Sequence, residues 1–227
     1  MNQLLAAIAY TVYAAFGLRL LWHILIWIRA SSAVRAYAPK YRTSFGTRIL
    51  MALDVIFFRR LLVANGMLWT ASWTFHLSFL VVVMRHLRLF IEPVPACVRE
   101  SQTCGLIAGY ILPASVLCLL LIRTVSAKER YLTRDNYLIL LLTLGIAMTG
   151  LLLRTVFRAD LVGIKRFTYG LLTFQPVMGQ NSYLFALHFS LALLLILILP
   201  SHLFSAPLVT IEARRREQAL NMVMHHD

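Results

Sequence analysis

Four histidines of this 227-residue chain lie in two long apolar stretches, His76 and His86 in one and His188 and His202 in the other. An imidazole inside hydrocarbon is costly unless its ring nitrogens are engaged. Two helices that each offer two imidazoles at matching depths can ligate two haem irons, one above the other. The pattern therefore predicts that these four side chains are the axial ligands of two b-type haems.

The spacing of the four histidines predicts which of them pair. Ten residues of α-helix rise about 15 Å, and fourteen rise about 21 Å. If the two helices run antiparallel, His86 and His188 share the outer depth of the membrane, and His76 and His202 share the inner depth. Each ligand ring also needs a partner for its second nitrogen. We expect a backbone carbonyl one turn earlier in the same helix to supply it.

A second reading of the histidines is a multi-histidine transporter of metal cations. Transport sites for divalent cations usually include carboxylates, whereas all nine acidic residues lie outside the apolar stretches or at their edges. A third reading, a quinone-linked thiol oxidase, needs at least two cysteine pairs, but only Cys97 and Cys104 are suitably placed, in one polar segment. Those two cysteines are compatible with a disulfide in an oxidising compartment.

Composition indicates an integral membrane protein, because 60% of the residues are hydrophobic and only 14% are charged. The net charge of +13 could suggest nucleic acid as a partner. The basic residues, however, lie at the ends of apolar stretches, where they fix orientation and meet lipid headgroups. We therefore expect the lipid bilayer, and no nucleic acid, as the partner of this charge.

The chain has enough apolar stretches for five crossings, each needing about 20 residues. No repeat or low-complexity linker divides it, so we expect one all-α transmembrane domain over 1–227, a bundle of five helices. The predicted spans are 4–28, 67–90, 106–124, 137–157 and 183–204.

The distribution of lysine and arginine predicts the orientation of these spans. Fourteen basic residues lie on the side that carries the C-terminus, and seven lie on the other side. By the positive-inside rule the N-terminus is outside and the C-terminus is cytoplasmic. On the cytoplasmic side, residues 45–60 form a short apolar segment with arginines. We expect it to be either an amphipathic helix lying in the membrane interface or a connecting helix packed on the bundle.

Small residues in the fourth span could admit a flat macrocycle close to the backbone. They equally suit ordinary close packing between membrane helices. The residues concerned are Gly145, Ala147, Thr149 and Gly150.

The residues 75–88 resemble the second helix of the γ subunit of respiratory nitrate reductase. They resemble at least as much that subunit's relatives in sulfate reducers and methanogens. These are the cytochrome b subunits of the sulfite-reduction-associated complex, the high-molecular-weight cytochrome c complex and the membrane heterodisulfide reductase. Segments 157–165 and 170–176 resemble the outer loop of these relatives, and the fourteen-residue spacing in the fifth span favours them over nitrate reductase.

The resemblance implies a dihaem cytochrome b that exchanges electrons with menaquinone and with a cytoplasmic iron–sulfur partner subunit. It further implies a redox subunit of a multisubunit oxidoreductase of anaerobic respiration, not a stand-alone enzyme. Other membrane subunits and a periplasmic multihaem cytochrome c are further partners in these relatives. The expected location is the bacterial or archaeal cytoplasmic (inner) membrane, crossed several times.

Cationic side chains near the histidines are candidates for contacts with haem propionates or quinone carbonyls. On the outer side these are Arg85 and Arg88, which flank His86, and Lys165. Near the inner end of the first span, Arg19 and His23 lie one turn apart and could hold the propionates of the inner haem. Each could instead contact headgroups or reach the membrane surface.

Overall fold

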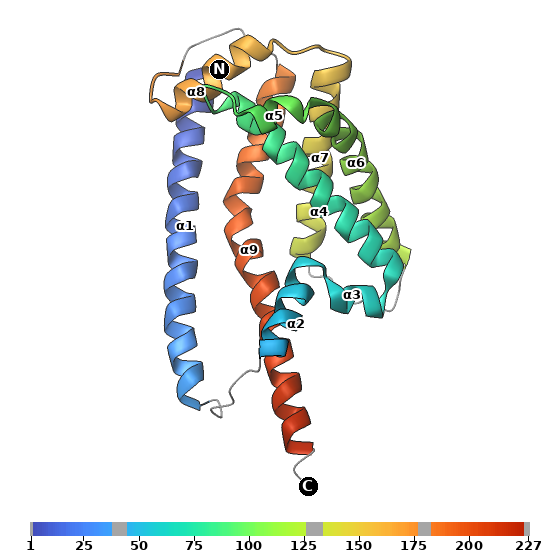
Figure 1. Ribbon diagram of the computed structural model, residues 1–227. Helices are drawn as coiled ribbons and strands as arrows, with labels where there is room; N and C mark the ends of the chain where they lie inside the picture. Colours follow the sequence, from blue (N-terminus) through green and yellow to red (C-terminus); the bar gives the residue numbers. More distant parts are fainter. Residues whose placement is uncertain (1, 38–44, 126–133, 177–182, 225–227) are drawn as a thin grey trace. The chain divides into compact units, whose positions relative to one another are not determined.

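The computed structural model describes residues 2–37, 45–125, 134–176 and 183–224 (Figure 1). All regular structure in these ranges is helical, without a strand, as an all-α protein requires. Five helices are long and apolar enough to cross a membrane. Both expectations are thus confirmed, while the orientation of the termini and the single-domain organisation stay predictions. The five candidate spans are Gln3–Arg29, Gly66–Leu89, Gln102–Val125, Asn136–Thr155 and Tyr183–Pro200.

The helices that contain these spans are α1 (Asn2–Tyr37), α4 (Gly66–His86), α6 (Gln102–Val125), α7 (Arg134–Thr155) and α9 (Tyr183–Met224). The last of them continues well beyond the predicted end at 204. Its extension contains the run of residues 211–220, rich in alanine, glutamate and arginine, which are good helix formers.

Between the spans lie α2 (Phe45–Ile56), α3 (Arg59–Ala64), a 3₁₀ turn η1 (Leu87–Leu89), α5 (Ala96–Glu100) and α8 (Leu161–Leu172). These shorter elements are too short to cross a bilayer.

By its internal contacts the chain divides into two compact units. The first comprises Met1–Val12 and Met67–Leu195, and the second comprises Tyr13–Gly66 and Ile196–Asp227. Helices α1 and α9 each contribute to both units. The histidines at 76, 86 and 188 belong to the first unit, and His202 belongs to the second.

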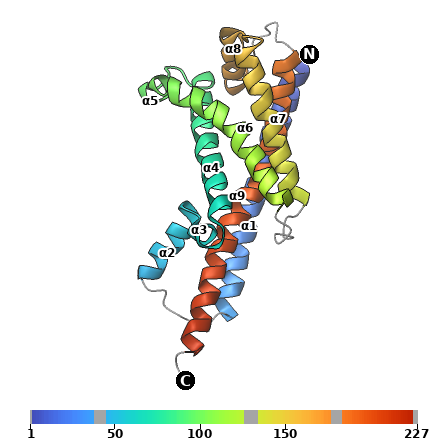
Figure 2. The same ribbon diagram turned by 90° about the vertical axis from the view of Figure 1, so that its right-hand side faces the viewer.

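In the first unit α6 packs against α7, and Figure 2 shows α6 inclined toward it. The buried residues of α6 recur every three or four positions, as in Leu112, Val116 and Leu119, and so form one face of the helix. Large apolar side chains on other faces remain exposed, among them Leu121 at 63% and Leu138 at 60%. An exposed apolar surface of this kind is typical of helices that face lipid.

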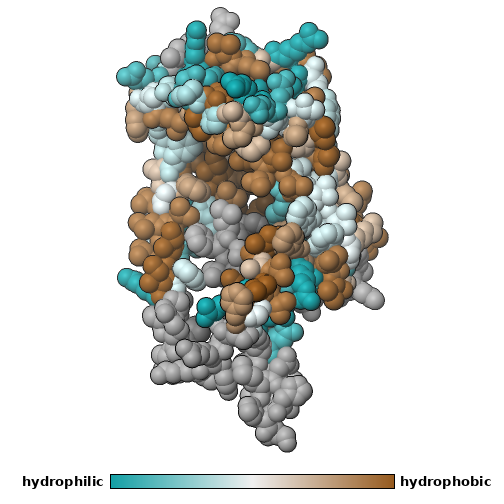
Figure 3. Space-filling view, viewed as in Figure 1, coloured by the Kyte–Doolittle hydropathy of each residue, from teal (hydrophilic) through white to brown (hydrophobic). Residues whose placement is uncertain are grey.

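Helix α8 closes one end of the first unit. Asp160 caps it by accepting a hydrogen bond from the backbone nitrogen of Val162 (3.1 Å). Its Phe167 is fully buried between Phe185 and Phe189 of α9, with ring centroids 6.0 and 5.7 Å away. On the face drawn in Figure 3, hydrophilic residues gather at this end, whereas hydrophobic residues cover the helices below it.

Candidate functional site

The rings of His86 and His188 face each other within the first unit. His86 is the last residue of α4, and His188 lies in the second turn of α9. Their ring centroids are 6.3 Å apart, and the ring planes differ by 24°. The two residues are 102 positions apart in the chain, so only the fold brings them together. These are the two rings that helix depth predicts as the outer pair, and their ligation of a haem stays a prediction.

The Nδ1 atom of each ring is held by a backbone carbonyl. His86 Nδ1 lies 2.8 Å from the Val82 carbonyl oxygen, one turn earlier in α4. His188 Nδ1 lies 3.1 Å from the Ile146 carbonyl oxygen of α7. A carbonyl can only accept, so each Nδ1 carries the proton and donates it. The lone pair of each neutral ring is then on Nε2, which is the tautomer required for ligation through that nitrogen.

The separation of the two rings fits ligation of a single metal centre. Two imidazoles on opposite sides of one metal have ring centroids roughly 6 Å apart, since each ligating nitrogen lies about 2.0 Å from the metal and about 1.2 Å from its ring centre. The 6.3 Å separation of His86 and His188 matches that geometry. Together with the tautomers, this separation is compatible with His86 and His188 holding one haem, which would supply a one-electron couple. In the described part of the chain, no group of three or more histidine, cysteine or acidic side chains is arranged to hold a metal ion.

Helix α7 packs closely against the His188 ring. Thr149 Oγ1 lies 3.0 Å from His188 Nδ1 and donates to the Gly145 carbonyl (2.8 Å), so its lone pair can accept from the ring. A Cβ atom on Gly150 would lie only 3.1 Å from His188 Cε1. The absence of a side chain at Gly150 therefore gives the ring its space. The sequence pointed to this stretch of small residues but left ordinary packing as an equal explanation.

The back-bonding expected of the ligand rings is confirmed for His76 and His86 of α4 and wrong for His188 of α9. His76 Nδ1 lies 2.7 Å from the Ser72 carbonyl oxygen, as His86 does from that of Val82. His188 instead uses a carbonyl of α7. The difference is tertiary in origin, because α7 offers both a carbonyl and a hydroxyl to this ring.

The predicted inner pair is only partly described. His76 lies on α4 in the first unit, its ring edge against Phe75 (4.8 Å). His202 lies on α9 in the second unit, in a stretch whose side chains fall outside those described. Arg19 and His23 lie on the part of α1 that belongs to the second unit. Their roles at an inner haem stay predictions.

Two arginines, Arg85 and Arg88, lie close to His86. The charges of Arg85 and Arg88 both act on its ring, and Arg88 is also within the field of Arg154. Arg85 is committed to structure, because its Nη1 donates to the Val98 carbonyl and its side chain covers Gly105. Arg88 forms no ion pair with any described acidic side chain. Arg88 is therefore better placed than Arg85 to meet an anionic group beside His86.

Lys165, the third outer cation, forms an ion pair with Glu92. The pair joins α8 to the segment that follows η1, and Thr168 Oγ1 of α8 donates to the Leu89 carbonyl (2.8 Å) in the same region. Lys165 is thus partly neutralised. Cys97 and Cys104 are exposed free thiols, without the disulfide that the sequence allowed.

Five helices long and apolar enough to cross a membrane, two of which bring His86 and His188 together, define an all-α membrane protein. The chain is similar to the Hdr-like menaquinol oxidoreductase cytochrome b-like subunit of Archaeoglobus profundus, with 34% identity over 149 residues, which are 59% of this chain and 44% of the relative. The subunit of the same name from Archaeoglobus fulgidus is 29% identical over 178 residues, which are 66% of this chain and 54% of the relative.

The resemblance to cytochrome b subunits of sulfate-reducer membrane redox complexes is thereby confirmed. The chain spans about half the length of the curated relatives it matches. No protein-family model and no solved structure matches it.

Proposed function

We propose that this chain is a membrane electron-transfer subunit that carries two b haems and exchanges electrons between menaquinone and a cytoplasmic iron–sulfur partner subunit. The observation that carries the proposal is the facing of His86 and His188 across 6.3 Å, with Nδ1 of both rings bonded to carbonyls. The printed names of the relatives, menaquinol oxidoreductase cytochrome b-like subunits, support the same role.

In this proposal His86 and His188 hold the outer haem through Nε2. The haem supplies a one-electron couple when bound. The protein residues fix both rings by hydrogen bonds at Nδ1, and Gly150 leaves room for the His188 ring. His76 and His202 hold the inner haem, since they are the two remaining histidines of these spans.

The residues around the outer site would bind the anionic and carbonyl groups of the ligands. Arg88 is the first candidate for a haem propionate or the quinone, because its charge has no acidic partner among the described side chains. Lys165 could contact the quinone only by sharing its ammonium with Glu92. At the inner site Arg19 and His23 take the corresponding role.

The partners follow from the same proposal. The chain lies in the cytoplasmic membrane of a bacterium or archaeon and docks a cytoplasmic iron–sulfur subunit. Further membrane subunits and a periplasmic multihaem cytochrome c complete the complex. Copurification of the tagged chain from native membranes, with mass spectrometry of the bound subunits, tests this part separately from haem content.

A reduced-minus-oxidised optical spectrum of the purified chain, with metal and porphyrin analysis, tests the central claim. We expect two haems per chain and the sharp α band of bis-histidine b haem, near roughly 560 nm. A chain without porphyrin that binds zinc or another divalent cation would instead support the metal-cation transporter.

Replacing Arg88 by glutamine removes a positive charge that acts on His86 and has no acidic partner among the described side chains. A nearby cation stabilises the reduced haem electrostatically, so losing this cation should lower the midpoint potential of one haem. We expect a fall of roughly tens of millivolts, because the site is partly solvated. Menaquinol oxidation should also show a higher KM. Potentiometric titration measures the first change, and Arg99→Gln on α5 is the control that should leave both values unaltered.

Replacing Thr149 by valine removes one of the two acceptors of the His188 Nδ1 proton. The Ile146 carbonyl remains, so haem should stay bound. The ligand ring becomes less electron-donating, and the potential of one haem should rise by less than about 60 mV, the equivalent of a tenfold change for one electron. Thr149→Ser, which keeps the hydroxyl, should restore the original potential. An equal shift in both variants would contradict a role for the hydroxyl.

A further inference from the structure

We propose that α2 and α3 lie in the headgroup region of the bilayer, with an apolar stripe against the lipid, and that Asp54 and Arg214 clasp this element to the distal part of α9. The side chains of the apolar stripe and of the Asp54–Arg214 pair all belong to the second unit. The inference does not depend on haem ligation.

The polarity of α2 is reversed relative to a helix of a soluble domain. Its buried side chains are Thr47 and Asp54, seven residues apart and therefore on one face. Its exposed side chains include Phe45 at 78%, Ile49 at 46% and Ile56 at 60%. Residues four and seven apart share a helix face, so these three form a continuous apolar stripe on the outside.

The apolar surface continues through the corner into α3. Phe58 has φ 50°, in the left-handed region, and this conformation turns the chain between the two helices. Beyond the corner, Leu62 and Val63 are exposed at 45% and 80%. The single segment predicted over 45–60 is thus two short helices that both present apolar side chains outward.

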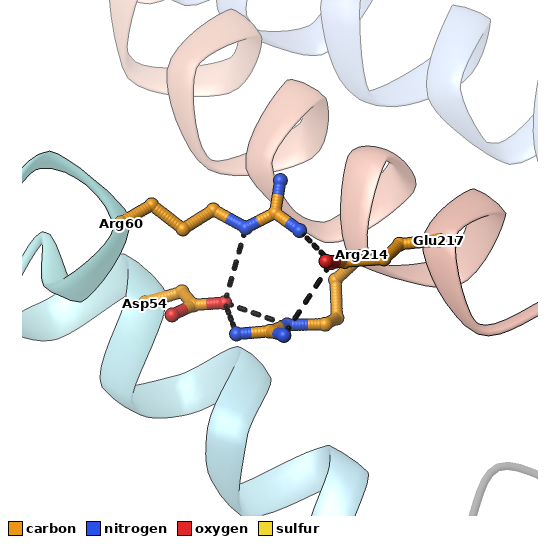
Figure 4. A network of polar contacts seen from close by, with 4 residues as sticks. All are labelled: Asp54, Arg60, Arg214 and Glu217. Carbon is orange, nitrogen blue, oxygen red and sulfur yellow. Dashed lines mark hydrogen bonds and ion pairs between the residues drawn. The ribbon is translucent and has the colours of Figure 1, made fainter. Parts of the chain in front are cut away.

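Figure 4 shows the clasp that holds the polar face of α2 inward. The Asp54 carboxylate is fully buried, and its Oδ2 accepts from Arg214 Nε at 2.8 Å and lies 2.6 Å from Arg214 Nη2. Arg60 Nε lies 3.5 Å from the same oxygen, and Arg60 also pairs with Glu217. Both Arg214 nitrogens contact the one oxygen Oδ2, and Oδ1 is buried without a hydrogen-bond partner among the described residues. Hydrogen bonds between an ionised arginine and a carboxylate are stronger than neutral ones, so the pair holds Asp54 to α9.

The bilayer is the occupant that the stripe fits best. The segment joins two helices that are each apolar enough to cross a membrane, Gln3–Arg29 and Gly66–Leu89, so both of its ends lie near the membrane surface. Arg48 and Arg59 are exposed on the same short helices. A short helix with an apolar face and flanking arginines is typical of an element in the interface, where the cations meet anionic headgroups.

Spin-label accessibility tests this placement in the full chain, reconstituted in nanodiscs that contain phosphatidylglycerol. The three native cysteines are replaced by alanine, and single cysteines are introduced as Ile49→Cys and Ile56→Cys. Matched references are Leu121→Cys, exposed on the span α6, and Glu100→Cys, exposed on α5. We expect the spin labels at Ile49 and Ile56 to be more accessible to oxygen than to a water-soluble nickel chelate. Their accessibilities should correspond to a depth of about 5–10 Å in the bilayer.

Nickel accessibility at Ile49 and Ile56 equal to that at Glu100 would overturn the proposal. Shielding of both labels from both reagents would also overturn it, because it would indicate a protein contact in place of lipid.

The role of Asp54 is tested by the mobility of the spin label at Ile49. Asp54→Asn should increase this mobility, whereas Glu217→Gln, which leaves Asp54 and Arg214 paired, should not. Unchanged mobility in Asp54→Asn would show that the clasp does not hold α2.

Discussion

His86→Ala is expected to yield a folded protein with one b haem per chain in place of two. Alanine removes the Nε2 lone pair that the Val82 carbonyl orients through Nδ1. The His188 ring alone cannot hold the macrocycle against competing water, since a bis-histidine site loses half of its axial bonds. Haem per chain, from the pyridine haemochrome, should fall by half, and His188→Ala should give the same result.

Double variants show whether the two histidines serve the same haem. Residues that act as a unit are strongly non-additive, so His86→Ala combined with His188→Ala should lose no more haem than either single variant. His86→Ala combined with His76→Ala should lose both haems. His226→Ala, in the C-terminal tail outside the described residues, is the control and should keep both. Separate losses from His86→Ala and His188→Ala would contradict the pairing.

The spans could be predicted from sequence, and the outer histidine pair could be proposed from it, because each depends on a simple regularity. Crossing a bilayer requires a long apolar stretch, and composition alone reveals five. Helix rise is constant at about 1.5 Å per residue, so depth assigns His86 to His188 without knowledge of side-chain packing. Their 6.3 Å separation agrees with that assignment.

The support of His188 could not be predicted, because it comes from another helix. Thr149 and Gly150 are 39 and 38 residues from it along the chain, and small residues in a membrane helix usually serve close packing. Only the contact between α7 and α9 shows that the ring fills the space above Gly150. Similarly, the histidine back-bonding rule holds for α4 but fails where α7 offers better acceptors.

The element at 45–60 shows a different limit. Its apolar pattern predicted a short helix, lying either in the membrane interface or packed on the bundle, but Asp54 alone gave no indication of its partner. Arg214 lies 160 residues away, beyond the predicted end of the fifth span at 204. Because α9 continues as a helix to Met224, that arginine reaches Asp54 from a rigid element. Long-range ion pairs of this kind depend on the tertiary fold.

Gly150→Ala is expected to lower the occupancy of one haem by about tenfold, in the range typical of altered support around a metal ligand. The added Cβ would lie 3.1 Å from His188 Cε1 and 3.6 Å from Nδ1, closer than ordinary van der Waals contact at the first atom. The ring must then move by several tenths of an ångström, and ligand geometry tolerates only about 0.5 Å. Gly150→Val adds two more methyl groups and should abolish that haem.

Gly145→Ala is the matched control, because it is the same substitution on the same helix. Among the described residues, its Cβ would have only Leu191 Cδ1 within 4 Å, at 3.6 Å, which is an ordinary contact. Both variants replace glycine by alanine in α7 and gain helix propensity, worth up to about 1 kcal/mol, so a difference in haem content between them reports on the His188 ring. Titration of haem into the apoprotein measures the two affinities. Equal haem affinity in the two variants would show that the space above Gly150 is not needed for ligation, and His188 would then have to bind from another position of its ring.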